Sequence, residues 1–299
     1  MVQTKEEKRF HYIGHIIMAL LAIGALIPIV LLVISSFTSN DEIIRRGYNF
    51  FPRELSLEAY RFIFISSDKI VRAYGMSFLV TALGTTASVI ITTMMGYPLS
   101  RRDLPFCSGL TFVVFFTMLF NGGLVPTYLT YTGIFKIKNT LWALIIPNLL
   151  MNGFNVLLMK SYFATNIPFE IIEAAYIDGS GEFNTFLRIV VPMSKPIIAT
   201  IGIFVGVAYW NDWNNGFIYL TTRTELYTIQ NLLNRMIQNI QFLTQNPSNL
   251  AQASEGLSKI PSASIRMSIA VMGILPIVVI YPFIQNNFVK GITLGGVKG

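Results

Sequence analysis

Six long apolar runs divide this sequence, and their length constrains the fold more than any other feature. A helix needs about 20 residues to cross the hydrocarbon core of a bilayer, and each run comes close to or exceeds that length. We therefore predict an all-α integral membrane protein, with residues 1–299 as a single transmembrane domain. The expected spans are residues 12–37, 74–99, 106–130, 140–163, 196–220 and 266–288.

Composition agrees with this class. Hydrophobic residues make up 53% of the chain and charged residues 12%, whereas about a quarter of the residues in soluble proteins are charged. The net charge of +7 is explained by basic residues that flank membrane spans, so we expect no nucleic acid partner. The lone Cys107 excludes an internal disulfide and a cysteine-based metal site. Two histidines, His11 and His15, cannot build a catalytic site, and we expect neither a metal site nor catalytic residues.

A polar stretch, residues 166–196, interrupts the apolar runs. Pro168 suits the first turn of a helix, with Asn166 upstream to help satisfy its N–H groups. Residues 169–177 then contain no helix breaker, and Gly179 is a natural C-terminal cap. We predict a second helix from Ser180 that Pro192 stops. The stretch contains four carboxylates, at Glu170, Glu173, Asp178 and Glu182.

The small Ala174 and Ala175 make the first of these helices thin enough for close docking, with Glu173 and Asp178 at the rim. Six residues of this stretch stand at the fixed spacing of a longer sequence pattern. They are Glu173, Ala174, Ala175, Gly179, Ile189 and Pro192. This stretch resembles the EAA loop of permease subunits in bacterial ABC importers, which reads E-A-A, three residues, Gly, nine residues, Ile-x-Leu-Pro. Val191 stands where leucine is usual.

The resemblance implies that residues 166–195 form a coupling loop that docks on an ATP-hydrolysing subunit. Asp178 is expected to contact the ATP-hydrolysing subunit together with the six matching residues. It also implies a cytoplasmic position for residues 164–195 and for both chain termini, which the distribution of basic residues leaves open. The simpler interpretation of this stretch is an amphipathic helical loop lying on the membrane surface.

The fifth run ends in aromatic, amide and carboxylate side chains, the groups that bind sugars. The candidates here are Tyr209, Trp210, Asn211 and Asp212, and carbohydrate importer subunits have a similar segment near the outer end of this span. The alternative is an aromatic belt at headgroup level, with Trp210 and Trp213. In the fourth run, Asn152 and Asn155 either bond across a helix interface or face the transport path. The stretch 121–126 is read as a helix end in preference to a water-filled path.

Two polar segments, residues 38–72 and 221–262, are expected outside the membrane. Each contains helical spacing, at residues 56–64 and 226–240. The C-terminal stretch 286–299, which ends in Val-Lys-Gly, is similar to the tail of the second permease of maltose-type importers. With the stretches 121–129 and 139–147, the resemblance extends along most of the chain. It points to the oligosaccharide or polysaccharide branch of that group.

The expected function is the membrane-spanning subunit of an ATP-driven carbohydrate importer in the bacterial cytoplasmic (inner) membrane. The chain lacks a Gly-x-x-x-x-Gly-Lys-Ser/Thr phosphate loop, so it is not an ATPase itself. We expect no cofactor in this chain, with ATP and magnesium on partner subunits. The implied partners are a homologous second permease, two ATP-binding subunits, an extracytoplasmic sugar-binding protein and the lipid bilayer. The alternatives are a secondary transporter driven by an ion gradient and a non-transporting membrane anchor for a cytoplasmic partner.

Overall fold

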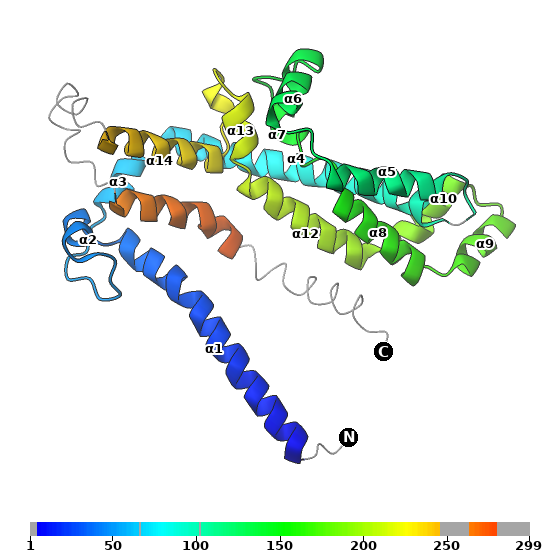
Figure 1. The fold of residues 1–299 in the computed structure, drawn as a ribbon, viewed down its shortest axis with the longest axis horizontal. Coiled ribbons are helices and arrows are strands. Elements are labelled where there is room, and N and C mark those ends of the chain that lie inside the picture. The colour runs from blue at the N-terminus through cyan, green and yellow to red at the C-terminus, as the bar shows by residue number, and fades with distance from the viewer. Residues whose placement is uncertain (1–4, 66, 102, 246–262, 280–299) are drawn as a thin grey trace. The chain divides into compact units, whose positions relative to one another are not determined.

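The computed structural model describes residues 5–65, 67–101, 103–245 and 263–279. These residues are mostly helical, which confirms the all-α part of the predicted class, and their only β pairing is a bridge between Thr38 and Leu55. Packing divides the chain into two compact units, Met1–Asp68 with Arg235–Pro276 and Lys69–Asn234 with Ile277–Gly299. Figure 1 shows the helices, and each unit is described by itself. The predicted C-terminal tail and residues 246–262 of the predicted loop lie outside the described residues.

The first unit contains α1 (Lys5–Ser36), α2 (Asn40–Arg46), α3 (Glu58–Phe64) and most of a helix at Ala263–Val279. α1 begins earlier than the predicted span and passes through Pro28 without a break. Its apolar side chains are exposed along nearly the whole helix, as lipid-facing side chains would be. α3 is the helix predicted within residues 56–64.

A buried carboxylate organises the segment between α1 and α3. Glu42 is 7% exposed, and its carboxylate accepts the backbone N–H of Arg53 at 2.8 and 3.1 Å and that of Glu54 at 2.6 Å. These bonds favour the charged form and hold the pKa of Glu42 below its usual value. Ser39 N–H also donates to the Glu54 carbonyl, at 2.9 Å. α2 and residues 53–56 are thereby fixed to each other.

The second unit is built around α4 (Ser67–Ser100), a helix of 34 residues. Two glycines allow neighbouring helices to approach it closely. A Cβ atom on Gly84 would overlap the ring of Tyr209 on α12 (Lys195–Asn211), and one on Gly96 would lie 2.8 Å from Cγ of Met159 on α8 (Gly153–Asn166). The buried core of this unit joins α4, α8 and α12 through residues such as Val80, Met159 and Ile201. Small residues on α4 thus form a packing surface for α8 and α12.

Several apolar runs are broken by short irregular segments. α5 (Cys107–Leu119) ends before the 120–123 turn, where Asn121 Oδ1 accepts Gly123 N–H at 2.8 Å. This is the helix end expected at 121–126. α6 (Leu124–Leu129) and the π-helix η1 (Thr130–Ile134) follow, and the bend from α5 is 114°. The range 106–130 is therefore not one straight helix, because Gly123 has a positive φ of 85°.

The fourth and fifth runs are also interrupted. α7 (Trp142–Ile145) and α8 are separated by a segment in which Asn148 has a φ of 63°. α12 is followed, after Asp212 and Trp213, by α13 (Asn214–Tyr219), the 3-10 turn η3 (Thr224–Leu226) and α14 (Ile229–Gln245). α14 corresponds to the helix predicted at 226–240. These interruptions place polar backbone and amide side chains at helix ends.

By length and composition, two helices of the described chain can cross a membrane, Arg9–Ser36 and Asp68–Ser100. The number of spans in the described chain is as many as four if each of two bent helix pairs forms one span. These pairs are Cys107–Leu119 with Leu124–Ile134 and Glu182–Met193 with Lys195–Asn211. Ala263–Val279 is a shorter apolar helix.

Candidate functional site

The polar loop begins with α9 (Phe169–Ile177), which has the predicted bounds. Pro168 is the residue that precedes its first turn, with extended backbone at φ −60° and ψ 134°. Asn166 does not cap this helix, contrary to expectation. Its Nδ2 atom donates to the Tyr162 carbonyl at 3.2 Å, because Asn166 still belongs to the last turn of α8.

Gly179 terminates α9 as the sequence predicts. It has a φ of 79°, its N–H donates to the Tyr176 carbonyl at 2.9 Å, and the following Ser180 N–H donates to the Ala175 carbonyl at 2.9 Å. These two bonds form a Schellman motif, which satisfies helix-end carbonyls and requires the left-handed conformation that glycine adopts most easily. The end of α9 therefore has a fixed geometry.

α9 presents two different faces. Ile172 and Ala175 are buried against the rest of the unit. Glu173, Ala174 and Asp178 are exposed, and Ile177 between them is 87% exposed. Of the two alanines expected to allow docking, Ala174 faces outward and Ala175 packs inward. An exposed isoleucine flanked by carboxylates on a rigid helix is suited to protein contact.

The second helix of the loop has an irregular path. α10 (Glu182–Thr185) runs into the π-helix η2 (Phe186–Val190) and then α11 (Val191–Met193). The expectation that Pro192 stops the helix is wrong by one residue, since the helix ends at Met193. The Val191 N–H bonds to the Phe186 carbonyl, five residues back, and this wide turn accommodates a proline without an N–H. Ile189 is half-buried and Pro192 exposed.

Arg101, at the end of α4, connects three elements through hydrogen bonds. Its Nε atom donates to Asp103 Oδ1 at 2.7 Å, and Nη2 donates to Asp103 Oδ2. Its Nη1 atom donates to Tyr97 Oη at 3.1 Å and to Tyr176 Oη at 2.8 Å. The same nitrogen lies 3.4 Å from Glu182 Oε1. We call these residues, with Phe169, the Arg101 cluster.

Aromatic rings complete the Arg101 cluster. The guanidinium carbon lies 5.5 Å from the centre of the Phe169 ring, 5.6 Å from that of Tyr176 and 5.9 Å from that of Tyr97. The whole residue is 6% exposed. The hydrogen bonds from Arg101 lower the pKa of Asp103, and those to Asp103 raise the pKa of Arg101. Both groups therefore remain charged.

Arg101 is not among the site residues predicted from the sequence. The available signal was local, an arginine followed two residues later by Asp103. The other partners cannot be paired with it from sequence, because Phe169, Tyr176 and Glu182 lie far along the chain. They meet Arg101 only after α9 and α10 have packed against α4.

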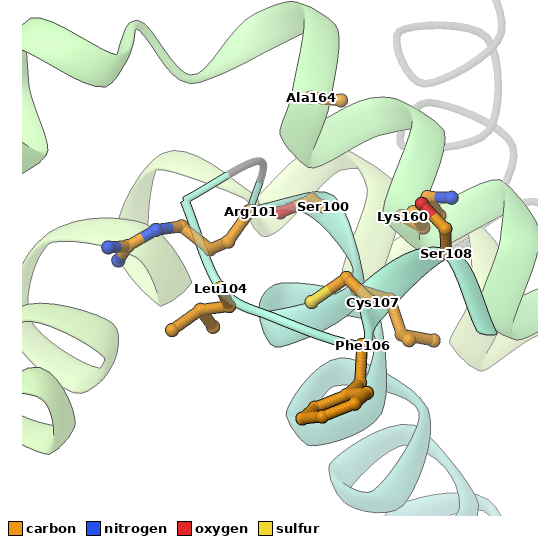
Figure 2. A pocket seen from close by; sticks show the side chains of 9 residues that line it. Ser100, Arg101, Leu104, Phe106, Cys107, Ser108, Lys160 and Ala164 are labelled. Atoms are coloured by element: carbon orange, nitrogen blue, oxygen red, sulfur yellow. The ribbon is translucent and has the colours of Figure 1, made fainter. Parts of the chain in front are cut away.

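A pocket of about 480 Å³ lies beside Arg101. In Figure 2 the guanidinium extends away from Cys107 and Lys160, which line the other side. Lys160 Nζ donates to Thr111 Oγ1 at 3.0 Å. Both cations of the pocket thus already have partners within the chain, and the loop itself is the stronger candidate site.

Two of the predicted sugar-path side chains, Tyr209 and Trp210, are buried in the second unit. Tyr209 is 1% exposed, and its hydroxyl donates to the Ile145 carbonyl at 2.7 Å. Trp210 is 5% exposed, with Phe78 5.2 Å and Tyr74 6.4 Å away between ring centres. Both residues therefore contribute packing to the end of α12.

The remaining path candidates lie at helix ends. Asp212 Oδ1 accepts the N–H groups of Asn214 and Asn215 at 3.1 and 3.2 Å and so starts α13. Asn215 Nδ2 in turn donates to the Pro147 carbonyl at 3.0 Å. The break between α12 and α13 and the break between α7 and α8 are therefore side by side.

The three asparagines among these candidates differ in exposure. Asn152 caps α8 by accepting Asn155 N–H at 3.3 Å, and Asn155 is buried. Asn211 is exposed, and its Nδ2 donates to the Val207 carbonyl at 3.0 Å. Exposed polar groups near two broken helices are available to line a path, whereas the buried ones are not.

No protein-family model matches the chain. It is 37% identical over 278 residues to the polygalacturonan/rhamnogalacturonan transport system permease protein YtcP of Bacillus subtilis (strain 168), covering 93% of this chain and 94% of that protein. The arabinooligosaccharides transport system permease protein AraQ of Halalkalibacterium halodurans is 27% identical over 289 residues, covering 94% of each.

A solved structure has the same fold. It belongs to a bacterial ABC transporter involved in the import of the acidic polysaccharide alginate, and the TM-score is 0.76 at 23% identity. The match covers 96% of this chain and 99% of that one. At this identity the likeness concerns the fold.

Proposed function

Because this chain belongs to the permease subunits of ABC sugar importers, we propose that α9, Gly179 and α10 form the surface on which the separate ATPase subunit docks. The observation that carries the proposal is the exposed face of α9. Ile177 projects between Glu173 and Asp178, while Ile172 and Ala175 anchor the helix from behind. Ile189 and Pro192 extend the same loop toward α12.

Docking on this face explains its composition. Ile177 is 87% exposed, and exposure of an apolar side chain to water is unfavourable. A partner that covers the side chain removes this cost, which favours binding. The flanking carboxylates favour a partner with basic residues around an apolar cleft. Because the Schellman motif fixes the end of α9, we expect the helix to move as a rigid body when a bound partner moves.

Reconstitution with the partner subunits tests this docking surface. The permease pair, the ATPase subunits and the sugar-binding protein would be assembled in vesicles, and ATP-dependent uptake measured. We expect Glu173→Ala, Ile177→Ser and Gly179→Pro each to lower ATPase binding and uptake. Ile65→Ser is the matched control, since Ile65 is 78% exposed and is not part of residues 166–195.

Several outcomes would contradict the proposal. Full ATPase binding and uptake in all three loop variants would exclude this face as the docking surface. Uptake that needs an ion gradient and no ATP would favour the secondary transporter, and ATPase binding without any uptake would favour a membrane anchor.

We propose that the cargo is an oligosaccharide released from a plant or microbial polysaccharide. The support is the naming of the relatives for polygalacturonan/rhamnogalacturonan and for arabinooligosaccharides. The test is binding-protein-stimulated ATP hydrolysis with oligomers of polygalacturonan, of arabinan and of maltodextrin. Stimulation by none of the three would reject the proposal.

For the path itself, the best candidates are the exposed Asn211 and Asn152 and the half-buried Asp212. Asn155, Tyr209 and Trp210 would act behind them by holding the broken helices in place. Irregular backbone at membrane depth is tolerated where it lines a cavity, which supports a path at the adjoining helix breaks. Asp212→Asn and Asn211→Ala should raise the KM for uptake, and an unchanged KM in both would reject the assignment.

The proposed assembly places six spans in the bacterial cytoplasmic membrane with both termini in the cytoplasm. The partners are a homologous second permease, two ATP-binding subunits that hold ATP and magnesium, and an extracytoplasmic sugar-binding protein. Cysteines introduced at residues 173 and 222 should be labelled from opposite sides of the membrane. Labelling from the same side would overturn this topology.

A further inference from the structure

Arg101 is a buried charge whose contacts join separate elements of the second unit. Burying a guanidinium is costly unless it is paired and hydrogen-bonded, and Arg101 at 6% exposure has partners on α4, α9 and α10. Tyr97 comes from its own helix, Tyr176 from α9 and Glu182 from the start of α10. The two helices of the loop are therefore attached to the end of α4 through one side chain.

Other contacts of the loop are apolar and less directional. Ile172 and Phe186 pack in the same buried cluster as Tyr97, and such surfaces can slide against each other. Among the described residues, the Arg101–Glu182 ion pair is the one that joins two different elements; the other two pairs, Arg101–Asp103 and Arg223–Glu225, lie within two residues of sequence. The Arg101 cluster thus supplies the directional link.

The N-terminal third of α4, at residues 77 and 78, contacts the region of the broken helices. Ser77 Oγ accepts the N–H of Ile229, the first residue of α14, at 2.8 Å, and Phe78 packs on Trp210 beside the α12–α13 break. From Ser77 to its end at Ser100, α4 is about 35 Å long at 1.5 Å per residue. A continuous helix of this length can carry a displacement from the loop to that region.

We propose that Arg101 is a positioning residue that joins the α9–α10 loop to α4, so that movement of the loop shifts the whole of α4. This inference rests on the proposed docking of the ATPase subunit on α9. A lysine cannot replace the arginine here. The planar guanidinium makes a two-pronged contact with Asp103 while its third nitrogen reaches Tyr176 and Glu182, and it stacks on aromatic rings.

The experiment compares variants in the reconstituted complex of both permeases, the ATPase subunits and the binding protein, with polygalacturonan oligomers as the sugar probe. The readout is the stimulation of ATP hydrolysis by sugar-loaded binding protein, expressed relative to the basal rate of the same assembled complex. Coupling between two sites in a protein typically changes affinity by roughly 5–150-fold. We expect Arg101→Lys to lower the stimulation at least about fivefold while assembly and basal hydrolysis persist.

Tyr176→Phe is the second variant, because it removes only the hydroxyl that accepts the 2.8 Å bond and keeps the ring. It should lower the stimulation in the same direction and by less. Arg72→Lys, an exposed arginine on the same helix, is the matched control and should behave as wild type. If Arg101→Lys fails to assemble, the Tyr176→Phe complex decides the question.

Two results would overturn the proposal. One is unchanged stimulation in assembled Arg101→Lys and Tyr176→Phe complexes. The other is a reduced amount of complex with normal stimulation, which is what a purely structural role predicts. Failure of the proposed docking surface gives a different result. In that case Glu173→Ala and Ile177→Ser would bind the ATPase subunit normally, while Arg101→Lys would still lose stimulation.

Discussion

The hydroxyl of Tyr209 donates a 2.7 Å hydrogen bond to the backbone carbonyl of Ile145. Ile145 is the last residue of α7, where carbonyl groups no longer have helical partners. Tyr209 supplies the missing donor from α12, and its ring fills the space that Gly84 leaves open on α4. One side chain thus holds three helices together at the broken segments.

Tyr209→Phe removes that donor and leaves the Ile145 carbonyl buried without it. We expect a loss of about 1 kcal/mol in the free energy of unfolding, measured by thermal or denaturant unfolding in detergent. The KM for sugar uptake should stay the same, because the hydroxyl is occupied within the chain. Tyr48→Phe, at an exposed position, is the control. A raised KM with full stability would mean that Tyr209 contacts the sugar.

Gly84→Ala should destabilise the second unit by about 1–3 kcal/mol, the usual range for overpacking a core. The added Cβ would overlap the rigid, buried ring of Tyr209, which has no room to move. The matched control is Gly109→Ala on α5, where nothing lies within 4 Å of the added atom. Unfolding measurements on both variants check the difference, and equal stability would disprove the close approach of α4 and α12.

Gly179→Ala should cost about 1–2 kcal/mol at the end of α9, because an L-residue is strained in the left-handed region. Gly181→Ala provides the comparison, since that glycine has a φ of −76° and open space around it. Hydrogen exchange of the Ser180 and Gly179 amides reports directly on the Schellman motif. Faster exchange in Gly179→Ala and not in Gly181→Ala is expected, together with lower uptake.

Glu42→Gln should weaken the first unit in a pH-dependent way. The bonds from the Arg53 and Glu54 amides lower the pKa of Glu42 below its usual 4.5, so the carboxylate stabilises the folded state fully above that pH. The contribution is lost as the pH falls through the lower folded-state pKa. The difference in unfolding temperature between wild type and Glu42→Gln should therefore be largest at neutral pH and shrink in acid. Glu58→Gln, at an exposed carboxylate, is the control substitution. A difference between wild type and Glu42→Gln that stays constant with pH would refute the assignment.

Local rules were sufficient for α9 and its C-terminal cap. The bounds of α9 and the conformation of Gly179 follow from helix propensity, a preceding proline and the special backbone of glycine, all of which act within a few residues. The same reasoning failed at Pro192 and Asn166. In both places a neighbouring helix turn, the π-helix η2 and the end of α8, supplied an alternative arrangement that local rules do not include.

Contacts between distant segments were beyond sequence reasoning. The burial of Tyr209, read as a sugar contact from its residue type, depends on the absence of a side chain at Gly84 and on a free carbonyl at Ile145. Arg101 meets Phe169, Tyr176 and Glu182 only in three dimensions. Residue type indicates what a side chain can bind, and packing decides which partner it finds.

The two sides of Arg101 differ in how firmly they hold. Asp103 engages two guanidinium nitrogens and follows closely in the chain, so this pair stays together when α4 moves. Tyr176 and Glu182 share the single Nη1 atom with Tyr97, at 2.8–3.4 Å. If the loop is pulled away from α4, the bonds between Arg101 and the α9–α10 loop should therefore break first. The salt bridge to Asp103 would still neutralise the arginine, which could then bind the loop again.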